Sequence, residues 1–202
     1  MSGVGSRARR EQAAFGGARL GAFGEMLVVG LGVAALSLPL VTIVPAVAAG
    51  ARHLDAHLEH ETDSVRRLLM LGGQAIRSGW WFGAASAVVV GMLLLNTLAA
   101  MQGLLPGGVA LGAVSGVLAT LVALAALRTA ALWEPRARWK DLWRAGRDLV
   151  IDDPIGDAFV LVGLGVSVVV VWMLPPLVVI APGLVVVALV AAERRRRAVT
   201  SA

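Results

Sequence analysis

Long uncharged stretches alternate with charge-dense stretches along this chain. Three stretches contain no Asp, Glu, Lys or Arg, and they cover Met26–Ala51, Ser78–Leu127 and Ala158–Ala192. A charged side chain at the centre of a bilayer costs about 2.5–3.5 kcal/mol on insertion scales, and a spanning helix needs about 20 apolar residues. The pattern therefore predicts an all-α fold, a polytopic transmembrane helix bundle in which lipid-embedded and aqueous segments alternate.

Proline and glycine divide the two longer stretches. The second stretch would be about 75 Å long as one helix, so we expect it to fold back at the Pro-Gly turn signal of Leu105–Gly108. The third is interrupted by Pro175-Pro176, because proline resists helix continuation. We predict about five spans, at 26–50, 80–101, 108–131, 155–174 and 176–192. They form a single transmembrane domain, 26–192, between a basic N-terminal tail, 1–25, and a basic C-terminal tail, 193–202.

The first uncharged stretch admits two other interpretations. The arginines before it and Ala46-Val47-Ala48 within it resemble a signal peptide and its cleavage site. The segment that precedes the stretch is too long for that, which disfavours cleavage. Alternatively, the stretch is re-entrant, bends at Pro39 and Pro45, and leaves both of its ends on one side of the membrane.

Basic residues gather on one side of the predicted bundle. The turns near 101–107 and 175–176 carry no charge, whereas the segments 52–77 and 128–157 and the run Arg194–Arg197 are rich in arginine. Because basic loops stay in the cytoplasm, we expect a multi-pass protein of the bacterial plasma membrane with a cytoplasmic C-terminus. Four N-terminal arginines would then lie outside, a conflict that a re-entrant first stretch removes.

Both predicted cytoplasmic segments contain amphipathic helices, one between spans 1 and 2 and one between spans 3 and 4. In the second, Trp139 and Trp143 lie on the apolar face, and Lys140 and Arg144 lie on the opposite face. Such a helix suits the surface of an anionic leaflet, where it either docks a cytoplasmic partner or only rests on lipid. In the first, Asp63 or Ser64 begins a helix that runs through Val65, Leu68, Leu69 and Ile76.

One helix start is visible in the sequence itself. Asp153 is followed by Pro154, which is the pattern of an N-cap residue and the first residue of a helix. The predicted fourth span therefore begins there. Tryptophans Trp80, Trp81, Trp133 and Trp172 stand near span ends, where indole rings favour the headgroup level.

The composition excludes several classes of function. The chain has no cysteine, so disulfides, thiolate metal sites and cysteine nucleophiles are impossible. It contains no P-loop, nucleophile elbow or HExxH motif. The net charge is +5, and the basic residues flank apolar stretches, as expected of a membrane protein and not of a nucleic-acid-binding one. We expect no enzymatic activity, no catalytic residue, no cofactor and no nucleic-acid partner.

Three histidines form the one pattern that suggests metal chemistry. His53, His57 and His60 lie four and three residues apart, on one helix face, and imidazoles at such spacing can bind zinc. Acidic residues are interleaved with them and no further ligand is evident, so we interpret the face as polar and assign no metal ligand. A membrane-embedded metal-dependent enzyme is the weakest of three functional hypotheses.

Small and polar residues within the spans suggest contacts. Gly108, Gly112 and Gly116 form a smooth stripe, which serves either as a packing seam within the chain or as a face for self-association. The main polar groups at depth, and the candidates for the polar path of a small transporter or channel acting alone, are Asn96, Thr97, Ser115 and Thr120.

The run Leu38–Ala46, Leu-Pro-Leu-Val-Thr-Ile-Val-Pro-Ala, resembles the YesL-like family of bacterial membrane proteins, as does Ala181-Pro182-Gly183. The resemblance implies about five spans and a non-enzymatic role accessory to carbohydrate or other solute uptake, with the lipid bilayer and transporter subunits as partners. Physically, Pro39 and Pro45 would free backbone carbonyls, and Thr42 could donate a hydrogen bond to one of them.

Overall fold

The computed structural model describes residues 24, 27, 29–37, 40–58, 65–104, 107–174, 177–178 and 180–200, and all regular structure in this part is helical. The elements in chain order are η1 (Leu40–Thr42), α2 (Ile43–Leu58), α3 (Val65–Met101), α4 (Gly108–Ala131), α5 (Trp139–Asp152), α6 (Pro154–Met173) and α7 (Ala181–Thr200). Residues 29–36 are also helical. Three helices, α3, α4 and α6, are long and apolar enough to cross a membrane. The all-α, membrane-type fold is therefore confirmed at this level.

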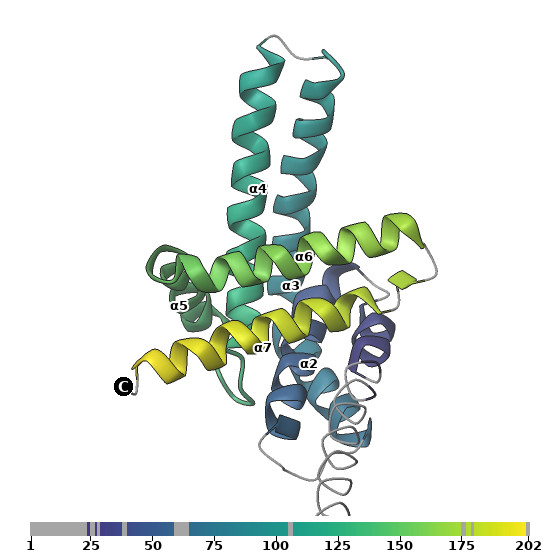
Figure 1. The fold of residues 1–202 in the computed structure, drawn as a ribbon, viewed down its shortest axis with the longest axis vertical. Coiled ribbons are helices and arrows are strands. Elements are labelled where there is room, and N and C mark those ends of the chain that lie inside the picture. The colour runs from purple at the N-terminus through teal and green to yellow at the C-terminus, as the bar shows by residue number, and fades with distance from the viewer. Residues whose placement is uncertain are drawn as a thin grey trace, which may run out of the picture.

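Helices α3 and α4 form a long hairpin whose tip lies far from the rest of the molecule (Figure 1). The expected turn is present, since α3 ends at Met101 and α4 begins at Gly108. Gly103 and Gly107 have φ angles of 73° and 70°, a backbone conformation that glycine adopts without steric cost. Helix α4 coincides with the predicted span 108–131, whereas residues 105 and 106 lie outside the described part.

Helix α3 begins much earlier than the span predicted at 80–101. It starts at Val65 and runs for 37 residues, so the amphipathic helix expected between spans 1 and 2 is the lower part of α3 and not a separate element. The glycines at 72, 73 and 79 do not interrupt it, because one glycine weakens a helix by only about 1 kcal/mol. The expected start near Asp63 or Ser64 lies outside the described residues.

The hairpin is held by close backbone contact and by polar links. A Cβ atom on Gly108 would lie 2.6 Å from the carbonyl oxygen of Ala100, and one on Gly112 would lie 3.1 Å from the Ala100 Cβ atom. Asn96 Nδ2 donates a hydrogen bond to Ser115 Oγ at 2.6 Å. The glycine stripe thus packs against α3 within the chain, and its use in self-association stays a prediction.

The first uncharged stretch folds back on itself instead of forming one helix over 26–50. Its helical residues 29–36 are followed by a turn at Ser37, and η1 and α2 then return along them. A Cβ atom on Gly50 would lie 2.5 Å from Val33 Cγ2, and Thr42 Oγ1 donates to the Leu36 carbonyl oxygen at 2.5 Å. The re-entrant alternative fits this arrangement, and the Thr42 hydrogen bond is confirmed.

The position of the bend differs from the one expected. Pro45 lies in the first turn of α2, where a missing N–H costs nothing because that donor has no partner within the helix. The chain reverses before η1, around Ser37, and the neighbouring Pro39 lies outside the described residues. The bend predicted at Pro45 is therefore wrong.

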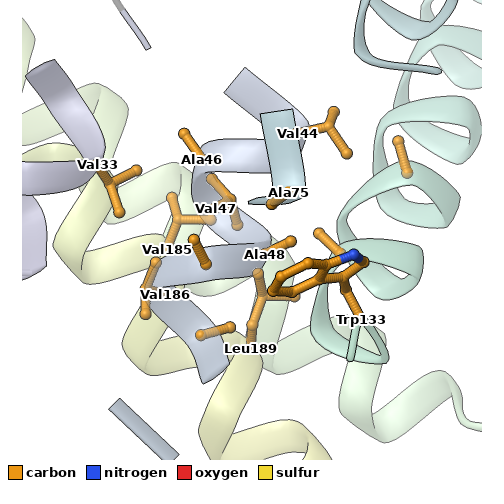
Figure 2. Packing of buried hydrophobic residues seen from close by; sticks show 14 of the residues in the cluster. Val33, Val44, Ala46, Val47, Ala48, Ala75, Trp133, Val185, Val186 and Leu189 are labelled. Atoms are coloured by element: carbon orange, nitrogen blue, oxygen red, sulfur yellow. The ribbon is translucent and has the colours of Figure 1, made fainter. Parts of the chain in front are cut away.

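Helix α2 lies at the centre of the packed part of the molecule. Every residue from Val44 to Ala51 is buried, as expected for a helix that is apolar all round. Figure 2 shows Val47 and Ala48 facing Val186 and Leu189 of α7, with Trp133 beside them. The alanine-rich sequence of α2 allows neighbouring backbones to approach closely on several sides.

Helices α6 and α7 pack side by side and run across the α3–α4 hairpin (Figure 1). A Cβ atom on Gly163 would lie 2.5 Å from the Ala188 Cβ atom. The last predicted span, 176–192, and the tail after it do not match the helix limits, because α7 begins at Ala181 and continues to Thr200. The five-span topology therefore stays a prediction.

Candidate functional site at the base of the hairpin

Charged residues gather where the C-terminal parts of α2, α4 and α7 meet the start of α6. This base cluster consists of Asp55, Arg128, Asp153, Asp157, Glu193, Arg194, Arg195, Arg196 and Arg197. It contains four carboxylates and five guanidinium groups, so its charges nearly balance. Buried charges are tolerated when they are paired and hydrogen-bonded.

Arg128 is the most deeply buried member of the base cluster, with 1% of its surface exposed. Its Nε atom donates to Asp157 Oδ1 at 2.7 Å, and its Nη2 atom donates to Asp153 Oδ2 at 3.1 Å. Nη2 also donates to the Asp153 carbonyl oxygen at 3.2 Å. One arginine near the end of α4 therefore fixes the start of α6.

Asp153 has several partners at once. Its Oδ1 atom accepts a hydrogen bond from the Gly156 amide at 3.0 Å, which confirms the predicted N-cap of α6. The Arg195 guanidinium of α7 pairs with the same oxygen. A Cβ atom on Gly156 would collide with the Asp153 carboxylate and with Arg128 Nη2, so only glycine fits here.

The other half of the base cluster joins α7 to α2. Asp55 Oδ1 accepts a hydrogen bond from Arg194 Nε at 2.7 Å, and Asp55 Oδ2 accepts one from Arg197 Nη1 at 3.1 Å. Glu193 accepts hydrogen bonds from Arg196 Nη2 at 2.6 Å and Arg197 Nε at 3.1 Å. The hydrogen bond to Glu193 raises the pKa of Arg196 above its ordinary value. The arginines expected to be a basic tail are thus bound within the fold.

A small cavity of about 110 Å³ opens beside this half of the cluster. Its lining includes Asp55, Trp133, Glu134, Glu193 and Arg197. A cavity of this size has room for several ordered waters among the paired charges. The base cluster therefore has the chemistry of a structural joint between helices.

Helix α5 is fixed against the base of the hairpin by an aromatic contact. Trp139 is buried, its ring stacks on Phe82 with centroids 5.3 Å apart, and its Nε1 atom donates to Ser78 Oγ at 3.0 Å. A Cβ atom on Gly79 would collide with the Trp139 ring. Trp133, expected at headgroup level, is instead buried and stacks on Trp139 at 6.4 Å.

The exposed side of α5 has two edges of opposite charge. With 3.6 residues per turn, one edge carries Lys140, Arg144 and Arg147, here called the basic edge. The other edge carries Asp141, Asp148 and Asp152, here called the acidic edge. The ion pairs between them, Arg144–Asp141 at 3.1 Å and Arg147–Asp148 at 3.2 Å, are solvent-exposed. Such surface pairs contribute about 0–1 kcal/mol each, so they bind these cations weakly.

An apolar groove of about 450 Å³ lies between the basic edge of α5 and the hairpin. It is lined by Trp81, Phe82, Ala85, Ser86, Val89, Val122, Lys140, Trp143 and Arg144. The two cations come from α5, whereas the apolar residues come mainly from α3. Sequence reasoning identified the amphipathic character of α5 but not this groove, because it needs three helices to form.

The histidines are not brought together as a metal site in the described part of the chain. His53 is buried and His57 is half-buried on α2, and His60 lies outside the described residues. No group of three or more His, Cys, Asp or Glu side chains with metal-binding geometry occurs among the described residues.

The polar residues predicted as a transport path are bonded within the hairpin. Asn96 donates to Ser115, and Thr97 Oγ1 donates to the Leu93 carbonyl oxygen at 2.9 Å. Thr120 Oγ1 donates to the Gly116 carbonyl oxygen at 2.9 Å. The hydrogen bonds of these side chains go to one another and to backbone carbonyls, so the side chains link the two helices or one turn of a helix to the next.

Comparisons with protein-family models, with curated proteins and with solved structures find no match for this chain. The resemblance to the YesL-like family thus stays an expectation from the sequence.

Proposed function

We propose that this chain is a non-enzymatic integral membrane protein that assists the uptake of carbohydrates or other solutes as an accessory subunit. The observation that carries the membrane part is the exposure of large apolar side chains along the hairpin and α6. Val109 at the hairpin tip is 90% exposed and Trp172 near the end of α6 is 84% exposed. Apolar surface this extensive marks a membrane or partner contact.

The distribution of charge supports one orientation. The apolar part of the hairpin, from Trp81 to Met101, is about 30 Å long at 1.5 Å per residue, which matches the hydrocarbon thickness. The tip carries no charge, whereas the arginines lie at the base. By the positive-inside rule, the base faces the cytoplasm of a bacterial cell. The C-terminal arginines face it too, because Arg194 and Arg195 pair with Asp55 and Asp153 of the base cluster.

The accessory role rests on the surfaces that remain for a partner. The side chains of the base cluster are paired with one another. The acidic edge of α5 does not line the groove, so a cytoplasmic partner can reach it. The apolar faces of the hairpin can contact the transmembrane helices of a transporter subunit. The resemblance to the YesL-like family supports the same role.

Topology can be tested with single cysteines, because the natural chain has none. We expect Gly103→Cys, at the hairpin tip, to react with an impermeant maleimide on intact cells. Asp148→Cys on α5 should react only after permeabilisation. Leu174→Cys tests the predicted crossing by α6, which requires this position to be labelled from outside.

The unmodified chain serves as the unlabelled control in that experiment. Labelling of Asp148→Cys on intact cells would refute the proposed orientation. Protection of Leu174→Cys on intact cells would leave α3 and α4 crossing the membrane but would contradict a crossing by α6.

The accessory role predicts a partner in native membranes. We expect the chain to stay in the pellet after alkaline carbonate extraction and to co-purify with subunits of a solute transporter in mild detergent. Substituting the acidic edge, as Asp141→Ala/Asp148→Ala/Asp152→Ala, should reduce the co-purified subunits, whereas Arg66→Ala on α3 should not. A chain that purifies alone, and whose deletion leaves carbohydrate uptake unchanged, would contradict the proposal.

The hydrogen bonds of the hairpin give less support to a small transporter or channel acting alone. Such a protein needs a polar path, and Asn96, Thr97, Ser115 and Thr120 already bond to each other and to backbone carbonyls. Solute flux into liposomes that contain only this chain would favour that alternative over the accessory role.

A further inference from the structure

The groove beside α5 follows the direction of the hairpin. Trp81, Ala85 and Val89 are spaced four residues apart on α3 and form one wall of it. At 1.5 Å per residue, this wall rises about 12 Å from the level of α5 toward the hairpin tip. In the proposed membrane orientation, the groove therefore runs from the inner headgroup level into the hydrocarbon.

The end of the groove near α5 carries positive charge. Lys140 and Arg144 line it, and both are exposed. Lys140 makes no ion pair within the described part of the chain, and Arg144 pairs only with exposed Asp141 at 3.1 Å. The acidic edge of α5 lies about 100° around the helix from the basic edge, and none of its residues lines the groove. The mouth of the groove therefore presents two available cations beside an apolar wall.

Two tryptophans flank the same mouth. Trp81 is 41% exposed, and Trp143 is half-buried against Phe82, with ring centroids 5.6 Å apart. Indole rings favour the boundary between headgroups and hydrocarbon. The cations, the indoles and the apolar wall thus follow each other in the order of a phospholipid's own phosphate, glycerol region and acyl chain.

We propose that this groove binds an anionic phospholipid, with an acyl chain along Ala85 and Val89 and the phosphate between Lys140 and Arg144. A zwitterionic lipid should bind less tightly, because its own ammonium group is repelled by the two cations. This inference rests on the membrane location proposed above. It adds a lipid-binding site on α3, α4 and α5 that anchors the base at the inner leaflet.

The test is native mass spectrometry of the full chain in mild detergent, with phosphatidylglycerol and phosphatidylcholine of identical acyl chains. We expect the natural chain to retain phosphatidylglycerol preferentially. Lys140→Ala/Arg144→Ala should lower this retention by about 25-fold, since each cation near an anionic surface contributes about fivefold. Ala85→Leu fills the groove without changing charge and should also lower retention.

Matched controls distinguish binding in the groove from general electrostatic attraction between the protein and anionic lipid. Arg66→Ala/Arg77→Ala removes two exposed cations of α3 outside the groove, and Ala110→Leu adds the same bulk on α4. Both should retain phosphatidylglycerol like the natural chain. Equal retention of the two lipids, unchanged retention by Lys140→Ala/Arg144→Ala, or equal loss in the control pair would overturn the lipid site.

Alkaline carbonate extraction of the same membranes keeps the two proposals distinguishable. A chain that carbonate removes from the membrane would refute the membrane function itself. A chain that stays in the membrane but shows no preference for phosphatidylglycerol would refute only the lipid site.

Discussion

Replacing Arg128 by alanine should lower the free energy of unfolding by about 3–5 kcal/mol, because it would leave the buried Asp157 carboxylate without its arginine and Asp153 with Arg195 alone. Arg128 is 1% exposed, and it pairs with Asp157 at 2.7 Å and Asp153 at 3.1 Å. The measurement is the midpoint of thermal unfolding in detergent, followed by size-exclusion chromatography.

A matched control and a compensating variant sharpen this result. Arg147→Ala removes an arginine whose pair with Asp148 is exposed, so it should change stability by less than about 1 kcal/mol. Arg128→Met combined with Asp157→Leu should recover part of the loss, because Asp153 keeps Arg195 as its partner. If Arg128→Ala unfolds at the same temperature as Arg147→Ala, the base cluster does not stabilise the fold.

Gly83→Ala should have the second-largest effect, a loss of about 3 kcal/mol from overpacking. A Cβ atom at this position would collide with the carbonyl oxygen of Val41 and lie 3.0 Å from Pro45 Cδ. Backbone atoms cannot move aside as a flexible side chain can, so α3 must separate from η1 and the start of α2. Thermal unfolding in detergent measures the loss.

The control for this substitution lies on the same helix. Gly91 has nothing within 4 Å of the position that its Cβ atom would take, so Gly91→Ala should leave stability nearly unchanged. Equal unfolding temperatures for Gly83→Ala and Gly91→Ala would contradict the close contact between α3 and the folded-back first stretch.

Features encoded by neighbouring residues were predictable from the sequence. Three such features each depend on residues a few positions apart. They are the cap of α6 by Asp153, the turn before Gly108 and the hydrogen bond from Thr42 to the Leu36 carbonyl oxygen. Their geometry follows from local backbone chemistry. The apolar stretches likewise predicted membrane-length helices over α3, α4 and α6, because insertion energy depends mainly on composition.

Features that join distant parts of the chain were not predictable in this way. Asp55 and Arg194, which pair in the base cluster, are 139 positions apart in the sequence. The arginines were therefore interpreted only as charges flanking a membrane, and the buried pair of Arg128 with Asp157 was missed. A weak signal existed, since Arg128 and Asp157 each stand directly beside an uncharged stretch.

The first stretch was mispredicted as one span because composition alone does not distinguish a straight helix from a folded one. Gly50 packs as tightly against Val33 of the same stretch as it would against another span. The continuity of α3 was missed for a related reason, because the change from polar to apolar surface at Trp80 does not require a break in the helix.

The division of the base cluster into two halves has a consequence for biosynthesis. Arg128 leaves the ribosome before Asp153 and Asp157, and Arg195 leaves it after them. The start of α6 can therefore gain its first guanidinium early, whereas Asp55 of α2 must wait for Arg194 and Arg197 until α7 has been made. A nascent chain that stalls within α7 would leave this carboxylate without Arg194 and Arg197.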